Sequence, residues 1–415
     1  MADVSVETAA QTTINYRMVR AGPVWTDAST GYIFFIDSGV DFFYRKTIDG
    51  GATWASAVNI KTATVVKASI WFDKWTTGDA GTKIHLAYTD SDSDDILYRA
   101  LDTNDDTLST EVVVFNGAAF ESDNFITNIL DITKSRGGNL YCAFWGNTAG
   151  QVGFYRSTDG GANWTNRASH ADGNLVDYIL LFPGNETDNN DIWCIYWDIS
   201  ADEISLKTYD NSADSWSETS ISTGMTDDPN GHYLQMSGVQ RHTDNHVILV
   251  AWSAKDTSTA DLRVWDITDS GTITAKTDVL TDSAETVQVA TFINQQNDDI
   301  YVAYLKGGTW QSTVDAFYKK SDDGAGTWGL ETAYSADTAD DLRAIWAGHS
   351  VDSNGGKFQP VFFNDDLDNL FVNTDNAVNI AAAAGGVTVT PSTLALVLSE
   401  FAPTVSTPRL VTPPT

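Results

Sequence analysis

The chain has 415 residues, of which 42% are hydrophobic and 11% aromatic, so it carries enough apolar surface to form a folded core. Acidic residues outnumber lysine and arginine by 56 to 24, and the formal net charge of −32 excludes nucleic acid and anionic membranes as expected partners. Met1 to Ala10 lack the features of a signal peptide, and no run approaches the roughly 18 apolar residues of a membrane helix, so neither export nor membrane insertion is expected.

A strand-like run recurs seven times along the chain. Equivalent positions fall at 44, 98, 155, 206, 262, 318 and 370, so the steps are 54, 57, 51, 56, 56 and 52 residues. The runs are 42–45, 96–99, 153–156, 204–207, 261–263, 316–319 and 369–371, and each follows a more apolar run, at 32–35, 85–88, 141–145, 193–197, 247–252, 301–304 and 361–363. Runs of this composition are typical of buried strands.

Further strand-like stretches complete each unit. They lie upstream at 68–72, 126–132, 287–293 and 342–346, and downstream at positions such as 111–115. Four strands in about 50 residues are typical of a propeller blade, which buries both faces only by stacking on its neighbours. We therefore predict an all-β fold, a seven-bladed β-propeller of four-stranded antiparallel blades over residues 16–380. It follows an N-terminal segment, 1–15, and precedes a linker with an extended C-terminal arm, 381–415.

The strand that closes the ring has two candidates. A stretch within Asp3 to Thr8 fits the outer strand of the last blade, and so does Ala377 to Ala381. Either would cover the edge of that blade, and the sequence pattern does not choose between them.

Three turns after the third predicted strand share one motif. They are Thr47-Ile48-Asp49-Gly50-Gly51-Ala52-Thr53-Trp54, Ser157-Thr158-Asp159-Gly160-Gly161-Ala162-Asn163-Trp164 and Ser321-Asp322-Asp323-Gly324-Ala325-Gly326-Thr327-Trp328. The pattern resembles the Asp-box, S/T-x-D-x-G-x-x-W, of the sialidase-like β-propellers, and the third copy departs from it by having Ala325 at the position of the glycine. A fourth copy, from Thr208 to Trp216, is one residue longer.

The chemistry of the motif is structural. The aspartate accepts hydrogen bonds from turn amides, the glycine supplies a positive φ and the tryptophan packs on the outer blade surface. The residues assigned to these turns are Asp49, Gly51, Trp54, Asp159, Gly161, Trp164, Asp210, Trp216, Asp323 and Trp328. In the family that the motif resembles, the boxes lie on the far side of the ring from the active centre, which implies that these aspartates are not catalytic.

Enzymes of that family hold a substrate carboxylate with three arginines. Tyr16-Arg17-Met18-Val19 resembles the family's aromatic-Arg-Ile-Pro motif, with Val19 in place of proline, and Arg241 and Arg343 are the arginines that could join Arg17. The loops between second and third strands should share that face and are acidic, at Asp90, Asp92, Asp94, Asp95, Asp198, Asp202, Asp365, Asp366 and Asp368. They would repel an anionic sugar, so we predict no catalytic residue. The alternative is a sialidase-like glycoside hydrolase or a glycan-binding lectin, for which neutral glycans remain candidate ligands.

One of these loops has an alternation that is typical of calcium ligands. Asp90, Asp92 and Asp94 present oxygen at every second residue, although the spacing is not that of an EF-hand. A looser calcium site is one interpretation, and a solvated acidic hairpin is the other.

The histidines and cysteines predict no further centre. His242 and His246 are four residues apart but lie in a strand-turn context, which disfavours a zinc pair. Cys142 and Cys194 occupy matching apolar runs, so we expect each to fill a small core site.

After Ile380 the composition changes to a linker of alanine and glycine and then to an apolar arm with several prolines. Thr390 to Leu396 and Phe401 to Val405 resemble tails of tailed-phage virion proteins. The resemblance implies a virion protein, assembled in the host cytoplasm, whose residues 387–415 bind other virion proteins or copies of the chain. We therefore predict a non-enzymatic structural, decoration or adhesion protein of a phage particle, with host glycans as candidate ligands of the propeller.

Overall fold

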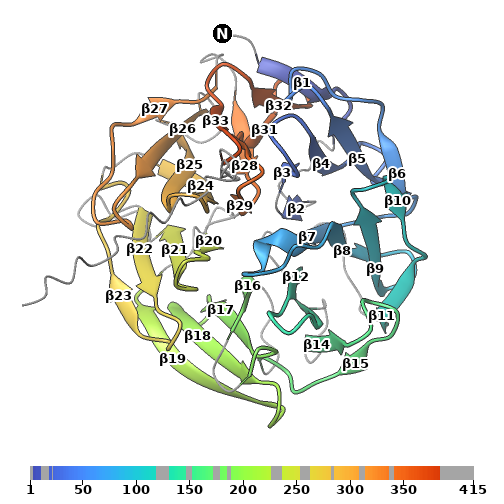
Figure 1. The fold of residues 1–415 in the computed structure, drawn as a ribbon. Coiled ribbons are helices and arrows are strands. Elements are labelled where there is room, and N and C mark those ends of the chain that lie inside the picture. The colour runs from blue at the N-terminus through green and yellow to red at the C-terminus, as the bar shows by residue number, and fades with distance from the viewer. Residues whose placement is uncertain are drawn as a thin grey trace, which may run out of the picture. The chain divides into compact units, whose positions relative to one another are not determined.

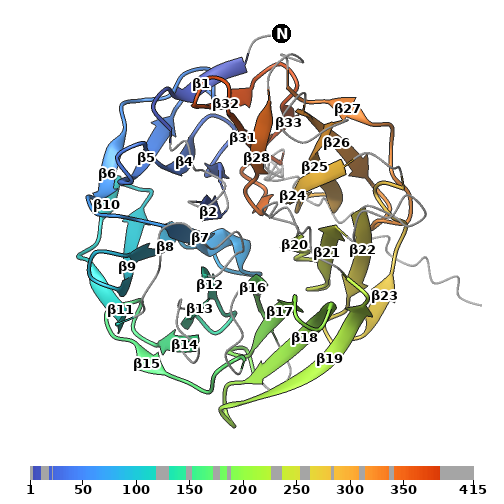
Figure 2. The ribbon, with the colours of Figure 1, turned by 180° about the vertical axis from the view of Figure 1, so that it is seen from behind.

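The computed structural model describes residues 3–10, 18–20, 22–117, 130–145, 152–171, 178–184, 188–225, 236–252, 262–281, 285–307, 314–335 and 341–383. Residues 1–383 form one compact unit. Its sheets stand around a central axis as seven blades, and the chain passes through them in sequence order (Figures 1 and 2). The predicted seven-bladed, antiparallel β-propeller is therefore confirmed.

Each blade runs from an inner strand at the axis to an outer strand at the rim. Blades 1 to 3 consist of β3 (Val24–Trp25), β4 (Gly31–Ile36), β5 (Phe42–Thr47) and β6 (Val58–Lys61); β7 (Lys67–Phe72), β8 (Lys83–Asp90), β9 (Asp95–Asp102), β10 (Thr107–Leu108) and β11 (Val112–Asn116); and β12 (Leu130–Lys134), β13 (Leu140–Trp145), β14 (Val152–Ser157) and β15 (Thr165–Asn166). The outer strand of blade 2 is thus divided, because β10 and β11 both pair with β9.

The remaining blades follow the same plan. Blades 4 to 7 consist of β16 (Tyr178–Pro183), β17 (Ile192–Asp198), β18 (Glu203–Asp210) and β19 (Ser215–Thr223); β20 (Met236–Gln240), β21 (Val247–Trp252), β22 (Leu262–Ile267) and β23 (Ile273–Ala275); β24 (Glu285–Asn294), β25 (Asp299–Gly307), β26 (Val314–Ser321) and β27 (Thr332–Ala333); and β28 (Leu342–Trp346), β31 (Val361–Asn364), β32 (Asn369–Asn373) and β1 (Asp3–Glu7). Every apolar run predicted as a second strand lies within a second strand.

The N-terminal strand closes the ring. β1 pairs antiparallel with β32, with Asp3 opposite Asn373 and Ser5 opposite Phe371. The side chain of Asn373 adds a hydrogen bond of 2.7 Å to the Asp3 carboxylate. The other candidate, β33 (Val378–Ile380), pairs instead with β30 (Gly356–Phe358). The last blade therefore has four strands without any residue beyond 373.

Short parallel strands add to the inner edges of two blades, which the repeat did not predict. β2 (Met18–Arg20) pairs with β7, and β29 (Ser350–Val351) pairs with β24. Polar side chains also join neighbouring inner strands: the carboxylate of Asp131 accepts from Ser69 Oγ at 2.6 Å and from the backbone N–H of Leu181 at 2.7 Å. One buried aspartate thereby links the inner strands of three blades.

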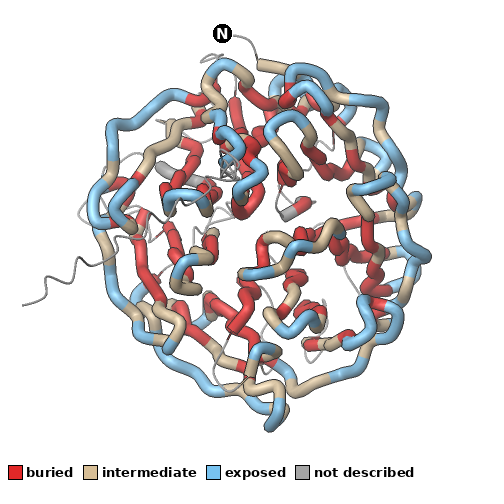
Figure 3. Tube along the Cα trace, viewed as in Figure 1, coloured by how far each residue is buried: buried red, intermediate tan, exposed pale blue. Residues whose placement is uncertain are grey.

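The core lies between the blades, as the buried inner parts of the ring in Figure 3 show. Second strands such as β4, β13, β21 and β31 are buried along their whole length. Large rings fill the space between sheets, and Trp71, Trp145, Trp193 and Trp197 are among the side chains that are completely buried. Both cysteines are buried, as predicted.

The antiparallel order gives the ring two different faces. We call the face that carries the connections from first to second and from third to fourth strand the turn face; it holds residues 47–54, 157–164 and 321–328. The opposite loop face holds the connections from second to third strand, such as 90–95, 198–203 and 364–369, and the start of each inner strand.

A buried tryptophan near the turn face contacts residues of distant blades. The connection after β7 contains a 3₁₀ turn, η1 (Asp73–Trp75), which reaches the centre of the ring (Figures 1 and 2). The Trp75 ring lies 4.7 Å from that of His349, and its indole N–H donates to Ser350 O at 3.1 Å. The residues that the structure describes include no helix long and apolar enough to cross a membrane.

Candidate functional site

The three turns that share the predicted motif have the same hydrogen bonds. In each turn the aspartate accepts from the hydroxyl two residues before it and from the backbone and side chain of the residue four positions after it. Around Asp49 these distances are 2.8 Å from Thr47 Oγ1, 2.9 Å from Thr53 N and 2.6 Å from Thr53 Oγ1. Asp159 and Asp323 have equivalent partners.

These hydrogen bonds fix the charge state of the turns. Donors from the residue four positions on lower the pKa of Asp49, Asp159 and Asp323 to about 2 in each case. A proton on any of them would break the turn, so none is suited to exchange protons at neutral pH. Each of these aspartates therefore accepts hydrogen bonds that hold its own turn.

The glycine position of the motif has a positive φ in all three turns. Gly51 has φ 82, Gly161 has φ 94, and Ala325 has φ 65 although it carries a Cβ. At Gly161 an added Cβ would come within 2.0 Å of the Tyr98 ring on blade 2, so close approach of two blades as well as backbone conformation demands glycine there.

The tryptophans of these turns lie at the outer edge of the blades. Trp164 is half-buried and lies 5.3 Å from the Tyr98 ring, and Trp328 donates to Thr277 O of blade 5 at 2.7 Å. Trp54 is half-buried against the core shared by blades 7 and 1. Each therefore contacts the blade before its own.

The fourth turn is of a different kind. Asp210 accepts from the backbone N–H groups of Ser212 and Ala213 at 2.8 and 2.9 Å, inside a tight connection between β18 and β19. Trp216 lies in β19 and donates to Ala168 O of blade 3 at 2.8 Å. This copy, which is one residue longer, therefore forms a β-hairpin and not the turn that the other three copies share.

The acidic loop 90–95 uses its own donors. Asp90 accepts from Asp92 N at 3.0 Å and lies 3.1 Å from Lys61 Nζ, and Asp92 accepts from Thr64 N at 3.2 Å. Asp94 adopts φ 58 at the tip of the turn. No group of three histidine, cysteine or carboxylate side chains in the described part of the chain is arranged to hold a metal ion. The geometry is that of a hydrogen-bonded hairpin.

The predicted arginines do not form one site. Arg343 follows the start of β28 on the loop face, whereas Arg241 follows the end of β20 on the turn face and binds Asp244 at 2.5 Å. Arg241 and Arg343 therefore lie at opposite ends of their inner strands and do not converge. Tyr16 and Arg17 lie outside the described residues.

The two histidines also face different partners. His242 Nε2 lies 3.2 Å from Trp75 O, and His246 Nδ1 lies 2.7 Å from an Asp266 carboxylate oxygen. Both belong to the connection between β20 and β21, which is the predicted strand-turn context. The His242 ring thus contacts the 3₁₀ turn of blade 2, and the His246 ring contacts the third strand of its own blade.

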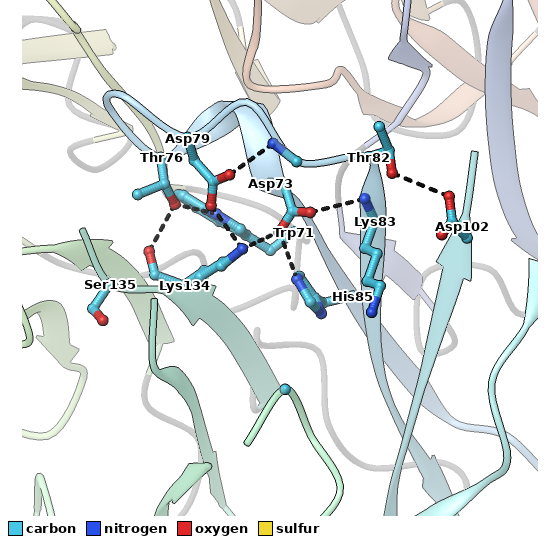
Figure 4. Close-up of polar contacts among 12 residues, drawn as sticks. Trp71, Asp73, Thr76, Asp79, Thr82, Lys83, His85, Asp102, Lys134 and Ser135 are labelled. Atoms are coloured by element: carbon cyan, nitrogen blue, oxygen red, sulfur yellow. Dashed lines mark hydrogen bonds and ion pairs between the residues drawn. The ribbon is translucent and has the colours of Figure 1, made fainter. Parts of the chain in front are cut away.

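The densest polar cluster surrounds Asp73 between blades 2 and 3 (Figure 4). Its carboxylate accepts from the His85 ring at 2.9 Å, from Lys134 Nζ at 2.5 Å and from the backbone N–H of Lys83 at 2.8 Å. Lys134 also lies 2.7 Å from Asp79. Although burial opposes the charge, these donors hold the pKa of Asp73 well below its ordinary value.

The same cluster continues to the turn of the next blade. His85 Nδ1 lies 2.7 Å from Tyr98 Oη, which in turn lies 3.3 Å from Gly160 O. Burial lowers the pKa of His85 and raises that of Tyr98, so both are neutral at pH 7. His85 and Asp73 are almost completely buried, at 3% and 4% side-chain exposure. The cluster pins η1 and two blades together and offers no substrate access.

One further cluster lies on the loop face, at blade 7. Arg343 binds Asp341 at 3.1 Å and Asp365 at 2.7 Å. Burial raises the pKa of both carboxyl groups above the ordinary value, in spite of the arginine. One arginine thus joins two carboxyl groups at this position of the loop face.

Asp73, His85, Lys134 and Asp341 were not singled out in the sequence. Asp73 and Lys134 are 61 residues apart and belong to different blades, so no local spacing connects them. The only signal was a polar residue, His85, inside an apolar second strand. The arm residues 387–415 lie outside the described residues.

Several solved structures have a similar fold. An ulvan lyase of a new polysaccharide lyase family has a TM-score of 0.54 and 11% identity over 92% of this chain and 95% of that chain. Hydrazine synthase of Kuenenia stuttgartiensis has a TM-score of 0.50 and 10% identity over 91% and 98%. A Hadza microbial sialidase has a TM-score of 0.45 and 13% identity over 70% and 63%. No protein-family model and no curated protein matches the sequence.

The likeness is one of fold. A lyase and a synthase share this ring with the chain although their activities differ, so the propeller itself does not select a reaction.

Proposed function

We propose that this chain is a non-enzymatic binding protein of a phage particle, in which the propeller binds a carbohydrate and residues 387–415 bind neighbouring virion proteins or other copies of the chain. The observation that supports the second role most is the closure of the ring by β1. Because β1 supplies the fourth strand of the last blade, the apolar arm is not needed to complete the propeller. An apolar segment that is not needed to complete the propeller is suited to bind a partner.

The point where the chain leaves the propeller supports an orientation. Gln296 donates to Ala381 O and Ala383 N donates to Ser353 O, both at 2.8 Å, and these partners belong to connections on the turn face. The described chain therefore ends on the turn face. In our proposal the turn face is attached to the particle and the loop face is directed outward.

Deletion of residues 384–415 tests the arm. The shortened chain should fold, because every described strand is kept, and should fail to enter particles. Single cysteines at Ala162 on the turn face and at Ala201 on the loop face, both exposed, test the orientation. In intact particles a maleimide reagent should label the loop-face cysteine more readily than the turn-face cysteine. The two native cysteines are buried and should not react in the folded protein. Unchanged incorporation of the shortened chain would remove the role of the arm.

The nature of the ligand is supported by charge and by fold. An ulvan lyase with this fold has been solved with a bound -[GlcA(1-4)Rha3S]- saccharide. With a net charge of −32 the present chain would repel such an acidic sugar, whereas loop-face carboxylates can accept hydrogen bonds from neutral hydroxyls. A glycan array together with fluorogenic glycosides tests this: we expect neutral glycans to bind without turnover, and binding of no glycan would refute the role.

A second candidate function rests on the Asp341, Arg343 and Asp365 cluster. Carboxyl groups with raised pKa values serve glycoside hydrolases as general acids. If the chain is a hydrolase, Asp341→Asn and Asp365→Asn should each abolish turnover of a glycoside that the wild type cleaves, while glycan binding persists. Absence of turnover across the fluorogenic panel would leave the binding function alone.

A further inference from the structure

The outermost strand of blade 4 differs from those of the other blades in length and exposure. β19 has nine residues, whereas the outermost strands of the other blades have two to five in the described chain. No residue of β19 is buried, and six of the nine are exposed. The strand is the last in the order β16-β17-β18-β19 and lies at the rim of the ring (Figures 1 and 2). Because only β18 pairs with it among the described strands, its outer edge presents backbone N–H and C=O groups to a further strand.

The composition of β19 lacks the features that usually protect such an edge. Six of its residues are serine or threonine, and it contains no proline, lysine or arginine. Its one charged side chain, Glu218, lies 3.4 Å from Lys207 of the neighbouring strand. An irregularity of the register after Ser220 leaves residues 215–220 as the regular part of the edge. Protected edge strands are short or carry lysine, proline or inward-pointing charges, so β19 is suited to pair with another strand.

One segment of the chain fits this edge in length and pattern. Residues 376–399 carry no charged side chain, although the whole chain has 56 acidic residues. Within them, residues 392–399 form a run of eight without proline, which a proline precedes and a glutamate follows. Leu394, Leu396 and Leu398 recur at every second residue of this run. That period is typical of a strand with one apolar face.

Charge favours this pairing over contacts between other surfaces of two copies. With a net charge of −32 on each chain, two copies repel one another over most of their surface. β19 offers mainly hydroxyl side chains and residues 392–399 offer no charge, so these two segments can approach with little repulsion. When a segment adds to the edge of a sheet in this way, main-chain hydrogen bonds supply most of the affinity.

An added strand would also cover an aromatic ring. Trp216 of β19 is half-buried, and its ring lies 5.0 Å from the Tyr209 ring and 4.9 Å from the Phe154 ring. Side chains directly opposite each other on neighbouring strands are about 5 Å apart. The leucines of residues 392–399 would therefore lie beside the Trp216 ring and bury more of it.

We propose that residues 392–399 of one copy of the chain add as a further strand to the outer edge of β19 of another copy. The inference rests on the proposed role of the arm and names the surface that receives it. Each copy offers one arm and one edge, so the contact is heterologous and joins copies into a closed ring or an open row.

The experiment uses the full chain with substitutions in the arm and in the edge. Leu396→Pro removes a backbone N–H in the middle of the arm segment, and Ser406→Pro, beyond that segment, is the matched control. Thr219→Pro and Ser220→Pro, both at exposed positions, act on the edge. Adjacent residues of a strand direct their N–H groups to opposite sides, so only one of these two substitutions removes a bond to β18. The one that keeps the wild-type midpoint of thermal unfolding is taken as the edge variant.

Light scattering and sedimentation over a concentration series measure the association of copies. The wild type and Ser406→Pro should associate, and Leu396→Pro and the edge variant should each associate about tenfold or more weakly. An equal mixture of Leu396→Pro and the edge variant should form a 1:1 pair, because the first keeps its edge and the second keeps its arm.

Hydrogen exchange tests the same contact without any change in β19. Amides of residues 215–220 should exchange about tenfold or more slowly in the associated wild type than in Leu396→Pro, because some of them gain hydrogen-bond partners. This measurement decides the question even if both proline substitutions in β19 destabilise the fold.

Three results would overturn the inference. The first is a wild type that remains monomeric up to about 1 mM; if its residues 215–220 are nevertheless protected relative to Leu396→Pro, the edge receives the arm of its own copy. The second is association without protection of residues 215–220, and the third is a mixture of the two variants that forms no pair.

These results are separate from the proposed role of the arm in the particle. If copies do not associate but deletion of residues 384–415 still prevents entry into particles, the role of the arm stands and β19 is not its receptor. If the deletion leaves incorporation unchanged, the role itself is refuted, whatever the chain does in solution.

Discussion

Lys67 at the start of β7 is a buried cation without a counter-charge. The residue is 3% exposed, and its Nζ has no hydrogen-bond partner among the described residues. Burial alone lowers the pKa of this amine from 10.5 to about 7. Replacement by methionine, which has nearly the same shape and no charge, should therefore stabilise the propeller.

The size of the effect follows from the pKa shift. Because the folded state binds the proton more weakly, folding stability falls as the pH falls from 10.5 toward 7 and changes no further below that. The full shift corresponds to about 5 kcal/mol, and at pH 7, where half of the folded molecules carry the proton, to about 4 kcal/mol. At pH 9.5 the penalty is about 1.5 kcal/mol.

The assay is urea unfolding of the wild type and Lys67→Met at pH 7 and pH 9.5. We expect the variant to gain about 3–4 kcal/mol at pH 7 and about 1 kcal/mol at pH 9.5, after a small packing loss. Lys83→Met, at an exposed position of the next strand, is the control and should change stability by less than about 0.5 kcal/mol at either pH. If Lys67→Met does not raise the free energy of unfolding, or raises it equally at both pH values, the inference that the Lys67 amine is buried and unpaired is refuted.

Three further results are expected. Gly161→Ala should cost at least about 2 kcal/mol more than Gly160→Ala in denaturant unfolding, since both have positive φ but only at Gly161 would the new Cβ collide with a tyrosine ring; equal costs would contradict this. Asp73→Asn should cost about 3–5 kcal/mol at pH 7 and Asp79→Asn less than about 1 kcal/mol, with the difference vanishing in acid as Asp73 itself becomes protonated. Burial raises the pKa of Cys142, so thiol reagents should react with this cysteine only after the protein unfolds. Fast labelling of the folded protein would contradict a packed core around Cys142.

The repeat made the architecture predictable because second and third strands carry their signal locally. Buried aromatic runs such as 193–197 must occur in every blade, so their spacing fixes the number of blades. Inner strands are harder to predict: β3 has two residues, and β20 follows a stretch with little alternation. Closure was undecided because β1 and β33 are both short strands with alternating apolar residues, and only pairing with the edge of β32 distinguishes them.

The buried polar residues could not be predicted from the sequence, for a different reason. His170 looked like any loop histidine, whereas in the folded ring it is buried beside the Trp145 ring of blade 3 and the Tyr196 ring of blade 4. Lys67 was one lysine in an otherwise apolar strand, and only packing shows that nothing neutralises it. Burial and missing partners are properties of the assembled ring.

The account depends most on a propeller that its own N-terminal strand completes. Thermal unfolding of two truncated chains measures this directly. Removal of residues 384–415 should leave one cooperative transition within about 2 °C of the full chain, whereas removal of residues 1–8 should lower the midpoint by about 10 °C or more, because it uncovers the edge of β32. The reverse order, with the C-terminal truncation the more damaging, would contradict the closed ring and the separate role of the arm.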